Sequence, residues 1–161
     1  PNQEIIRQVI QAGMTAPDHG KLSPWRFKLF LGEDRQKLGE AFVKAAQQKG
    51  KNSPSDQERY LAMPFRAPLV IMVVARLQEH PKIPLSEQCL AVGACVQNMQ
   101  LALQAFSFGC IWRTGEMAYD SVVKEHLGLL SKDEIVAFLY VGTPKTMVRR
   151  QVLPSIDGYL L

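Results

Sequence analysis

An uncharged stretch in the second half of the chain constrains the fold more than any other feature. Between Gln88 and Trp112 there is no Asp, Glu, Lys or Arg, and apolar residues occupy nearly every face of a helical projection. Pro84 is a helix start signal and Gly109 is a stop signal, so the pattern predicts one long helix. A helix that is apolar all round is buried on all sides in a soluble protein.

A membrane span is the first alternative for this stretch. Amide side chains argue against it, because an unsatisfied amide is costly in hydrocarbon; they are Gln97, Asn98, Gln100 and Gln104. We therefore predict a buried soluble helix and no membrane partner. A domain of 161 residues is too small to cover so long a helix alone, so we expect a second copy of the chain to cover part of it in a homodimer.

Two motifs accompany the helix. The first reads Gly93-Ala94, Asn98-Met99, Leu101-Ala102-Leu103, Gly109-Cys110-Ile111-Trp112 and Arg113-Thr114-Gly115. The second lies upstream and reads Ala16-Pro17-Asp18-His19 and Ser23-Pro24-Trp25. Together they resemble the nitroreductase-like flavoprotein family, in its small single-domain form with Pro-Asp-His and Trp-Arg-x-Gly. The resemblance covers nearly the whole chain.

The expected fold class is α+β. The predicted helices cover residues 1–14, 32–48, 56–63, 85–108 and 120–127, and the predicted strands cover residues 26–31, 69–75 and 135–142. These strands are too few and too irregularly spaced for a run of βαβ units, so we expect one mostly antiparallel sheet flanked by helices. The resemblance implies the same nitroreductase-like fold, with the long helix at the homodimer interface. The length predicts a single domain over residues 1–161, and we expect the tail from Lys145 to lie across the partner subunit.

Composition excludes several classes of function. The net charge of +4 is too mild to indicate nucleic acid, and no basic run is interleaved with aromatic residues. Three cysteines without a C-x-x-C pair indicate reduced thiols in a cytoplasmic protein; they are Cys89, Cys95 and Cys110. The three histidines show no metal-ligand spacing, and no signal peptide is visible.

Familiar catalytic motifs do not occur. There is no G-x-G-x-x-G after a strand, no Walker A motif, no H-E-x-x-H and no G-x-S-x-G. A flavin enzyme is consistent with that pattern, because the cofactor carries the hydride chemistry and the protein supplies binding and orientation. The resemblance implies FMN as cofactor and NADH or NADPH as reductant, with no catalytic side chain and no metal required.

The resemblance places five residues in contact with FMN: Thr15, His19, Trp112, Arg113 and Thr114. It also implies that His19 reaches the site of the other subunit. Arg113 can donate charge-assisted hydrogen bonds to phosphate or to the pyrimidine edge of the ring. The alternatives are a surface histidine at His19, a surface ion pair at Arg113 and a plain core residue at Trp112.

The resemblance also suggests where the nicotinamide nucleotide approaches. The segment is the end of the long helix, namely Ala102, Leu103, Gln104, Ala105, Phe106 and Ser107. Further along, Lys145, Arg149 and Arg150 could anchor phosphate, although a solvated basic tail is the simpler interpretation.

One departure from the family concerns the start of the chain. Members usually begin with a helix that carries Arg-Arg-Ser or a similar basic pair, which grips the flavin phosphate. Residues 1–14 match the part of the family pattern that lies after that segment, and Arg7 alone does not replace it. The expectation is that the basic segment is missing from this chain or that flavin binding is weakened or lost.

The sequence therefore favours an FMN-dependent oxidoreductase that passes hydride from NAD(P)H to nitro compounds, quinones or similar electron-poor small molecules. The active sites would be shared between the two subunits of a homodimer. One alternative is a non-catalytic dimeric scaffold that binds flavin or lacks it. Another is a flavoenzyme of the same fold with a different acceptor.

Overall fold

The computed structural model describes residues 1–146, 153 and 155–160. Its α-helices are α1 (Gln3–Gly13), α2 (Asp34–Gln48), α3 (Pro54–Ala62), α4 (Leu85–Ala105), α5 (Gly115–Ala118) and α6 (Ser121–His126). Two short 3-10 helices are η1 (His19–Lys21) and η2 (Met63–Arg66), and the strands are β1 (Trp25–Leu31), β2 (Leu69–Arg76), β3 (Gly109–Arg113) and β4 (Asp133–Gly142).

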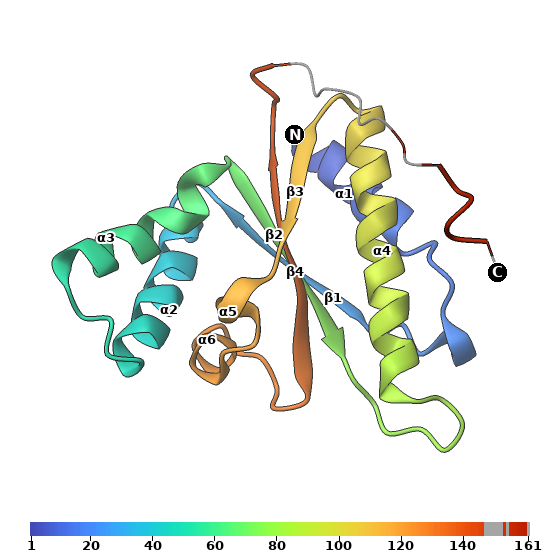
Figure 1. The fold of residues 1–161 in the computed structure, drawn as a ribbon, viewed down its shortest axis with the longest axis horizontal. Helices are drawn as coiled ribbons and strands as arrows, with labels where there is room; N and C mark the ends of the chain where they lie inside the picture. Colours follow the sequence, from blue (N-terminus) through green and yellow to red (C-terminus); the bar gives the residue numbers. More distant parts are fainter. Residues whose placement is uncertain (147–152, 154, 161) are drawn as a thin grey trace.

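The strands form one four-stranded sheet in the order β1-β2-β4-β3, and every neighbouring pair is antiparallel. Helices α1 and α4 cover one face, and α2, α3, α5 and α6 lie on the other (Figure 1). The predicted α+β class with a mostly antiparallel sheet is confirmed. The predicted helices and strands are all present, with boundaries that differ by a few residues.

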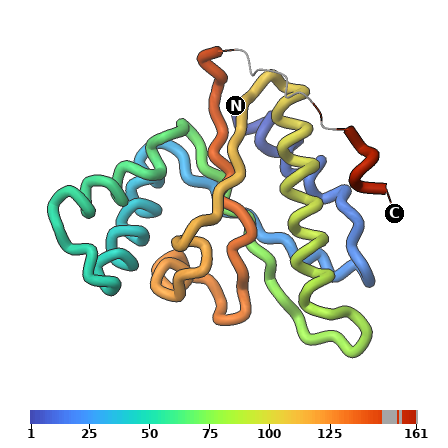
Figure 2. The backbone as a smooth tube through the Cα atoms, in the orientation of Figure 1, coloured from blue at the N-terminus to red at the C-terminus, as the bar shows by residue number. Residues whose placement is uncertain are grey.

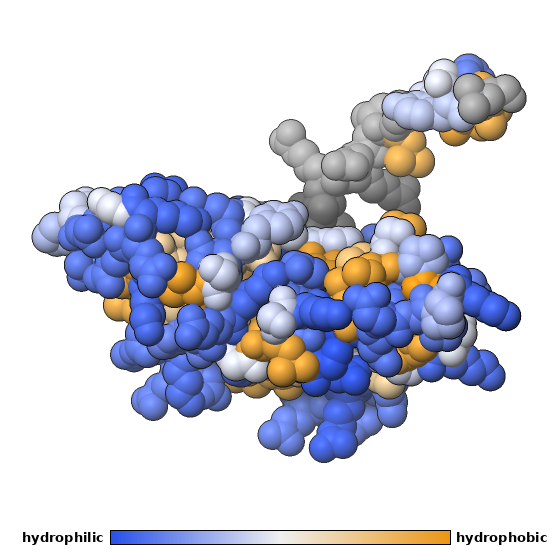
Figure 3. Space-filling view, turned by 90° about the horizontal axis from the view of Figure 1, so that it is seen from below, coloured by the Kyte–Doolittle hydropathy of each residue, from blue (hydrophilic) through white to orange (hydrophobic). Residues whose placement is uncertain are grey.

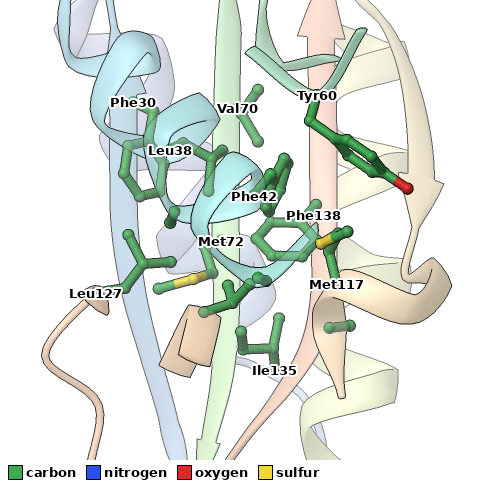
Figure 4. Close-up of a cluster of buried hydrophobic side chains, with 14 of the residues drawn as sticks. Phe30, Leu38, Phe42, Tyr60, Val70, Met72, Met117, Leu127, Ile135 and Phe138 are labelled. Atoms are coloured by element: carbon green, nitrogen blue, oxygen red, sulfur yellow. The ribbon is translucent and has the colours of Figure 1, made fainter. Parts of the chain in front are cut away.

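Strand β2 is central and buried on both faces, which explains its continuous apolar sequence. Alternate side chains face opposite layers: Ile71 joins the core under α1 and α4, whereas Met72 joins the core under α2. Figure 4 shows the second of these cores, where α2 packs onto the sheet. Within it Phe42 and Phe138 meet edge to face, with ring centroids 5.3 Å apart.

Strand β4 carries a bulge in its pairing with β2. Val73 pairs with Ala137 and Val74 pairs with Ile135, so Val136 has no partner of its own on β2. At the bulge, the regular alternation of side chains between the two faces of the sheet is interrupted. Ile135 packs in the core under α2, whereas both Val136 and Ala137 pack in the core under α1 and α4.

Helix α4 is buried along one face only within the single chain. The buried residues are Gln88, Ala91, Val92, Cys95, Val96, Met99 and Leu103. The opposite face presents Leu90 and Leu101, which are 73% and 56% exposed. Hydrophobic patches interrupt a mainly hydrophilic surface on the side of the molecule that carries α4 (Figure 3). The chain itself therefore buries only one face of this helix, whereas we expected burial on all sides. The homodimer stays a prediction.

We predicted that α4 ends later than it does, and we did not predict the strand that follows it. The helix ends at Ala105 rather than at Phe108, because the backbone turns at Ser107, whose φ of 62° is left-handed. Residues 109–113, which lie in none of the predicted strands, form strand β3 at the edge of the sheet. In the part of the chain that the structure describes, no helix is long and apolar enough to cross a membrane.

The predicted tail falls largely outside the described residues, which exclude 147–152, 154 and 161. Arg149 and Arg150 are among those excluded. The described apolar residues of this region are exposed, namely Leu153, Ile156, Tyr159 and Leu160.

Two helical glycines offer a matched test of packing. A Cβ on Gly39 of α2 would lie 2.7 Å from the carbonyl oxygen of Leu61, whereas a Cβ on Gly93 of α4 would find its nearest neighbour at 3.9 Å. Gly39→Ala should therefore force α2 away from α3 and lower the free energy of unfolding by about 1–3 kcal/mol. Gly93→Ala should not lower it, since alanine favours the helix. Urea unfolding of both variants checks this, and equal effects would contradict the packing argument.

Candidate functional site

The segment from Trp112 to Thr114 is positioned by the bulge in β4. Strand β3 pairs with β4 as far as Arg113, opposite Phe138. Just beyond that pair lies Val136, whose carbonyl oxygen accepts a hydrogen bond from Trp112 Nε1 at 2.9 Å. The bulge thus supplies an acceptor that fixes the indole. Trp112 is 38% exposed, so it is neither plain core nor a free surface residue.

Arg113 lies where two cavities meet. A larger cavity of about 550 Å³ extends along the edge of the sheet, and a smaller one of about 360 Å³ lies between α3, α5 and the sheet. Arg113 and Tyr140 line both of them. Both volumes are in the range of small-molecule sites. The predicted contact residues Arg113 and Thr114 therefore lie in the walls of cavities large enough for a ligand.

The smaller cavity has aromatic walls and a polar rim. Its lining includes Phe42, Arg59, Tyr60, Met63, Arg113, Thr114, Gly115, Glu116, Met117, Phe138 and Tyr140. Tyr60 projects from α3 at the margin of the hydrophobic cluster, and its hydroxyl turns away from the aliphatic side chains (Figure 4). That hydroxyl donates to Glu116 Oε1 at 2.9 Å and accepts from Lys51 Nζ at 2.9 Å.

Charge is balanced at that rim. Hydrogen bonds from Lys51 and then from Tyr60 lower the pKa of Glu116, and hydrogen bonds to Tyr60 and Glu116 raise the pKa of Lys51. Glu116 is therefore a carboxylate and Lys51 an ammonium at neutral pH, and neither is poised to exchange a proton. Their role in this geometry is to hold Tyr60 and α5 in place.

Thr15 and His19 lie on the other side of the sheet, along α4. Thr15 Oγ1 donates to the Ala12 carbonyl at 2.7 Å and accepts from Asn98 Nδ2 at 3.3 Å. Figure 2 shows the loop that carries His19 running beside the first turns of α4. His19 Nδ1 lies 2.6 Å from Glu87 Oε2, and both side chains are solvent-exposed. This pair borders a shallow hollow of about 310 Å³ with Leu90 and Ala94.

The predicted site residues thus fall into groups within one chain. Arg113 lines both cavities and Thr114 lines the smaller one, whereas Thr15 and His19 lie along α4 on the opposite face of the sheet. Trp112 links the two sides, because its ring lies over Gly93 of α4. The segment predicted for the nicotinamide nucleotide, Ala102–Ser107, ends α4 at the far end from Glu87. In that segment Leu103 is buried and Gln104 to Ser107 are exposed.

Several lining residues escaped the sequence interpretation. Arg66, Tyr60 and Tyr140 line the cavities but come from η2, α3 and β4. Arg66 lies in a short link between prolines, and that was the only available signal. Their convergence depends on tertiary packing, which no local pattern reports.

The cysteines provide no nucleophile. All three are free, and burial raises the pKa of each thiol, that of Cys95 to about 12. That these thiols are reduced in a cytoplasmic protein stays a prediction. Among residues 1–146, 153 and 155–160, no group of His, Cys, Asp or Glu could hold a metal ion.

Comparison with known proteins gives consistent results. The nitroreductase family profile matches residues 1–143. A relative from Escherichia coli (strain K12), named "Putative NAD(P)H nitroreductase YdjA", is 40% identical over 145 residues, which are 90% of this chain and 79% of the relative.

Solved structures share the fold. A nitroreductase-like family protein from Bacillus cereus has a TM-score of 0.83 at 25% identity, over 100% of this chain and 84% of its own. A nitroreductase with bound FMN from Bacteroides fragilis has a TM-score of 0.72 at 16% identity, over 98% and 86% of the two chains. The profile match and the Escherichia coli relative together show that the chain belongs to the nitroreductase family.

Proposed function

We propose that this protein is an FMN-dependent oxidoreductase that takes hydride from NADH or NADPH and reduces nitro compounds, quinones or similar electron-poor small molecules. The observation that carries the proposal is the position of Arg113 at the junction of two cavities, with Thr114 beside it in the wall of the smaller one. Family membership supports it, as do the names of the relatives: one is an NAD(P)H nitroreductase and one contains FMN.

The residues present suit a flavin mononucleotide. The smaller cavity has Phe42, Tyr60, Phe138 and Tyr140 among its lining residues, and aromatic rings pack favourably against a fused ring system. Gly115 has a φ of 60° and open space where a Cβ would be, so backbone can approach a ligand closely there. Arg113 makes no ion pair with any residue that the structure describes, so its guanidinium is available.

When bound, the flavin would supply the capacity to accept and release a hydride, which no side chain here has. The chain's own residues bind and orient. Arg113 would hold an anionic group or the pyrimidine edge of the ring, and Thr114 would offer its backbone beside it. Lys51 and Glu116 would keep Tyr60 fixed in the wall. Because α4 leaves Leu90 and Leu101 exposed, a second copy of the chain would cover them.

We further propose that each site is shared by the two subunits of this homodimer. Thr15 and His19 lie beside the exposed face of α4, away from the cavities of their own chain. Across an α4–α4 interface they would reach the partner's Arg113 side of the site. The end of α4, from Ala102 to Ser107, would then border the approach of the nicotinamide nucleotide. Three free thiols support a reducing, cytoplasmic setting.

The visible spectrum and the initial rates test the function. We expect a flavin absorption band on reconstitution with FMN, and parallel double-reciprocal plots at several fixed acceptor concentrations. The physical reason is that one flavin must serve the reductant and the acceptor in turn, so the two substrates alternate. Intersecting plots would contradict alternation. Absence of any flavin band after reconstitution would favour the scaffold alternative instead.

A further inference from the structure

Three cations from separate segments converge on the larger cavity. Arg66 is the last residue of η2, Arg113 ends β3, and Lys145 follows β4. None of the described residues that line this cavity is Asp or Glu. The wall also includes Thr143 and Thr146, whose hydroxyls can donate hydrogen bonds.

Several other cations of this protein lie close to acidic groups. Arg76 pairs with Asp133, Lys49 with Asp120 and Lys124 with Glu134. By contrast, Arg66, Arg113 and Lys145 form no ion pair and no side-chain hydrogen bond within the described part of the chain. Like charges that gather around a cavity without a counter-charge repel one another, and an anionic ligand relieves that repulsion.

Tyr140 connects this cluster to the smaller cavity. Its side chain lines both cavities, and burial raises the pKa of its hydroxyl while Arg66 and Arg113 act in the opposite direction. Both guanidinium groups therefore lie close enough to affect that hydroxyl. A ligand with an anionic end among the cations would have its other end at the aromatic walls of the smaller cavity.

We propose that Arg66, Arg113 and Lys145 bind the phosphoryl group of a nucleotide cofactor. Planar guanidinium groups match phosphate oxygens two at a time, and the lysine adds a point charge. The phosphoryl group could be that of FMN or the 2′-phosphate of NADPH, and the chemistry at the cluster is the same. This assignment rests on the proposed function, because it takes the cofactor of that function and states which of its ends enters which cavity.

Binding measurements on charge-removing variants test this. Arg66→Gln and Lys145→Gln are compared with Arg7→Gln and Lys44→Gln, which remove the same charges at exposed positions outside the cavities. Each protein is titrated with FMN, riboflavin, NADPH and NADH. Loss of one charge-assisted phosphate contact should weaken binding about tenfold or more.

If the phosphoryl group belongs to FMN, the FMN dissociation constant should rise in both cavity variants and the riboflavin constant should not. If it belongs to NADPH, the NADPH constant should rise and the NADH constant should not. The control variants should match the parent protein. Equal weakening of FMN and riboflavin would indicate a change of shape, and no weakening of any ligand would leave the cluster without a role; either result overturns the proposal.

A titration with inorganic pyrophosphate, followed by phosphorus NMR, separates this proposal from the proposed function. If the parent binds no flavin but binds pyrophosphate in a way that Arg66→Gln abolishes, the cluster is an anion site and the flavin function fails. If flavin binds and neither FMN, NADPH nor pyrophosphate depends on Arg66 or Lys145, the function stands and the cluster assignment fails.

Discussion

Mixed dimers of His19→Ala and Arg113→Ala should regain activity that neither parent variant has. Each homodimer should bind flavin about 10- to 150-fold more weakly, because each loses a polar contact to the cofactor. In a hybrid of the two, a shared site that takes His19 from one chain and Arg113 from the other carries either both substitutions or neither. With random reassortment, about a quarter of all sites should then be intact.

The measurement is activity at limiting FMN after the two variants are unfolded together and refolded, with each variant refolded alone as the baseline. Sedimentation confirms that dimers have formed. A reciprocal control uses the double variant mixed with the parent chain. If the sites are shared, every site in a hybrid dimer of this control mixture carries one substitution, so the hybrids contribute no activity. Recovery in the control but not in the His19→Ala and Arg113→Ala mixture would place both residues in a site within one chain.

Asp133→Ala should destabilise the fold more than any surface substitution. Asp133 is only 1% exposed, yet both of its carboxylate oxygens are used: Arg76 Nε and Nη2 donate to Oδ1 and Oδ2 at 3.1 and 2.9 Å. The Leu130 N–H donates as well, at 3.0 Å. Removal of this carboxylate should lower the free energy of unfolding by about 2–4 kcal/mol.

The pH dependence of that loss has a defined sign. Burial alone would raise the pKa of Asp133, but hydrogen bonds from Arg76 and Leu130 outweigh it, so the folded pKa lies below the ordinary value. A depressed folded pKa stabilises the protein above the unfolded pKa of about 3.9, and the stabilisation is lost as the pH falls through the folded value. The difference in free energy of unfolding between the parent protein and Asp133→Asn should therefore have its full value at pH 7 and disappear only in strong acid.

Urea unfolding at a series of pH values measures this gap. The matched control is Lys132→Ala, which breaks the neighbouring exposed pair between Lys132 and Glu79. Because water already solvates both of those groups, the control should change stability little. An equal loss from the control, or a gap for Asp133→Asn that is independent of pH, would contradict the argument.

The parts of the fold that the sequence predicted are those governed by local rules. The continuous apolar run from Leu69 to Ala75 predicts a strand buried on both faces, and it forms β2, one of the two inner strands of the sheet. Asn2 is a residue type typical of a helix N-cap, and its side chain accepts from the Ile5 N–H at 2.9 Å. Asp120 caps α6 in the same way, through Val122.

The parts that it could not predict depend on pairs far apart in the chain. The cavities bring Arg66 and Tyr60 beside Arg113, and no periodicity within any one segment reports that meeting. Which face of α4 is exposed could not be predicted for the same reason. The composition shows that the helix is apolar, but only tertiary packing determines which side faces the sheet. The flavin-contact positions came from resemblance to a family rather than from physical reasoning on single residues.

The bulge at Val136 sets which layer each later side chain of β4 enters. A strand read strictly by twos from Ile135 would put Ala137 and Leu139 under α2, and Phe138 and Tyr140 under α4. The extra residue resets that phase, so that Phe138 packs against Phe42 and Tyr140 reaches the cavities. Deletion of Val136 would restore regular alternation and leave Phe138 and Tyr140 in the layer they already occupy, but it would remove the carbonyl that accepts from the Trp112 indole. The core could therefore be built without the extra residue, whereas the position of the indole could not.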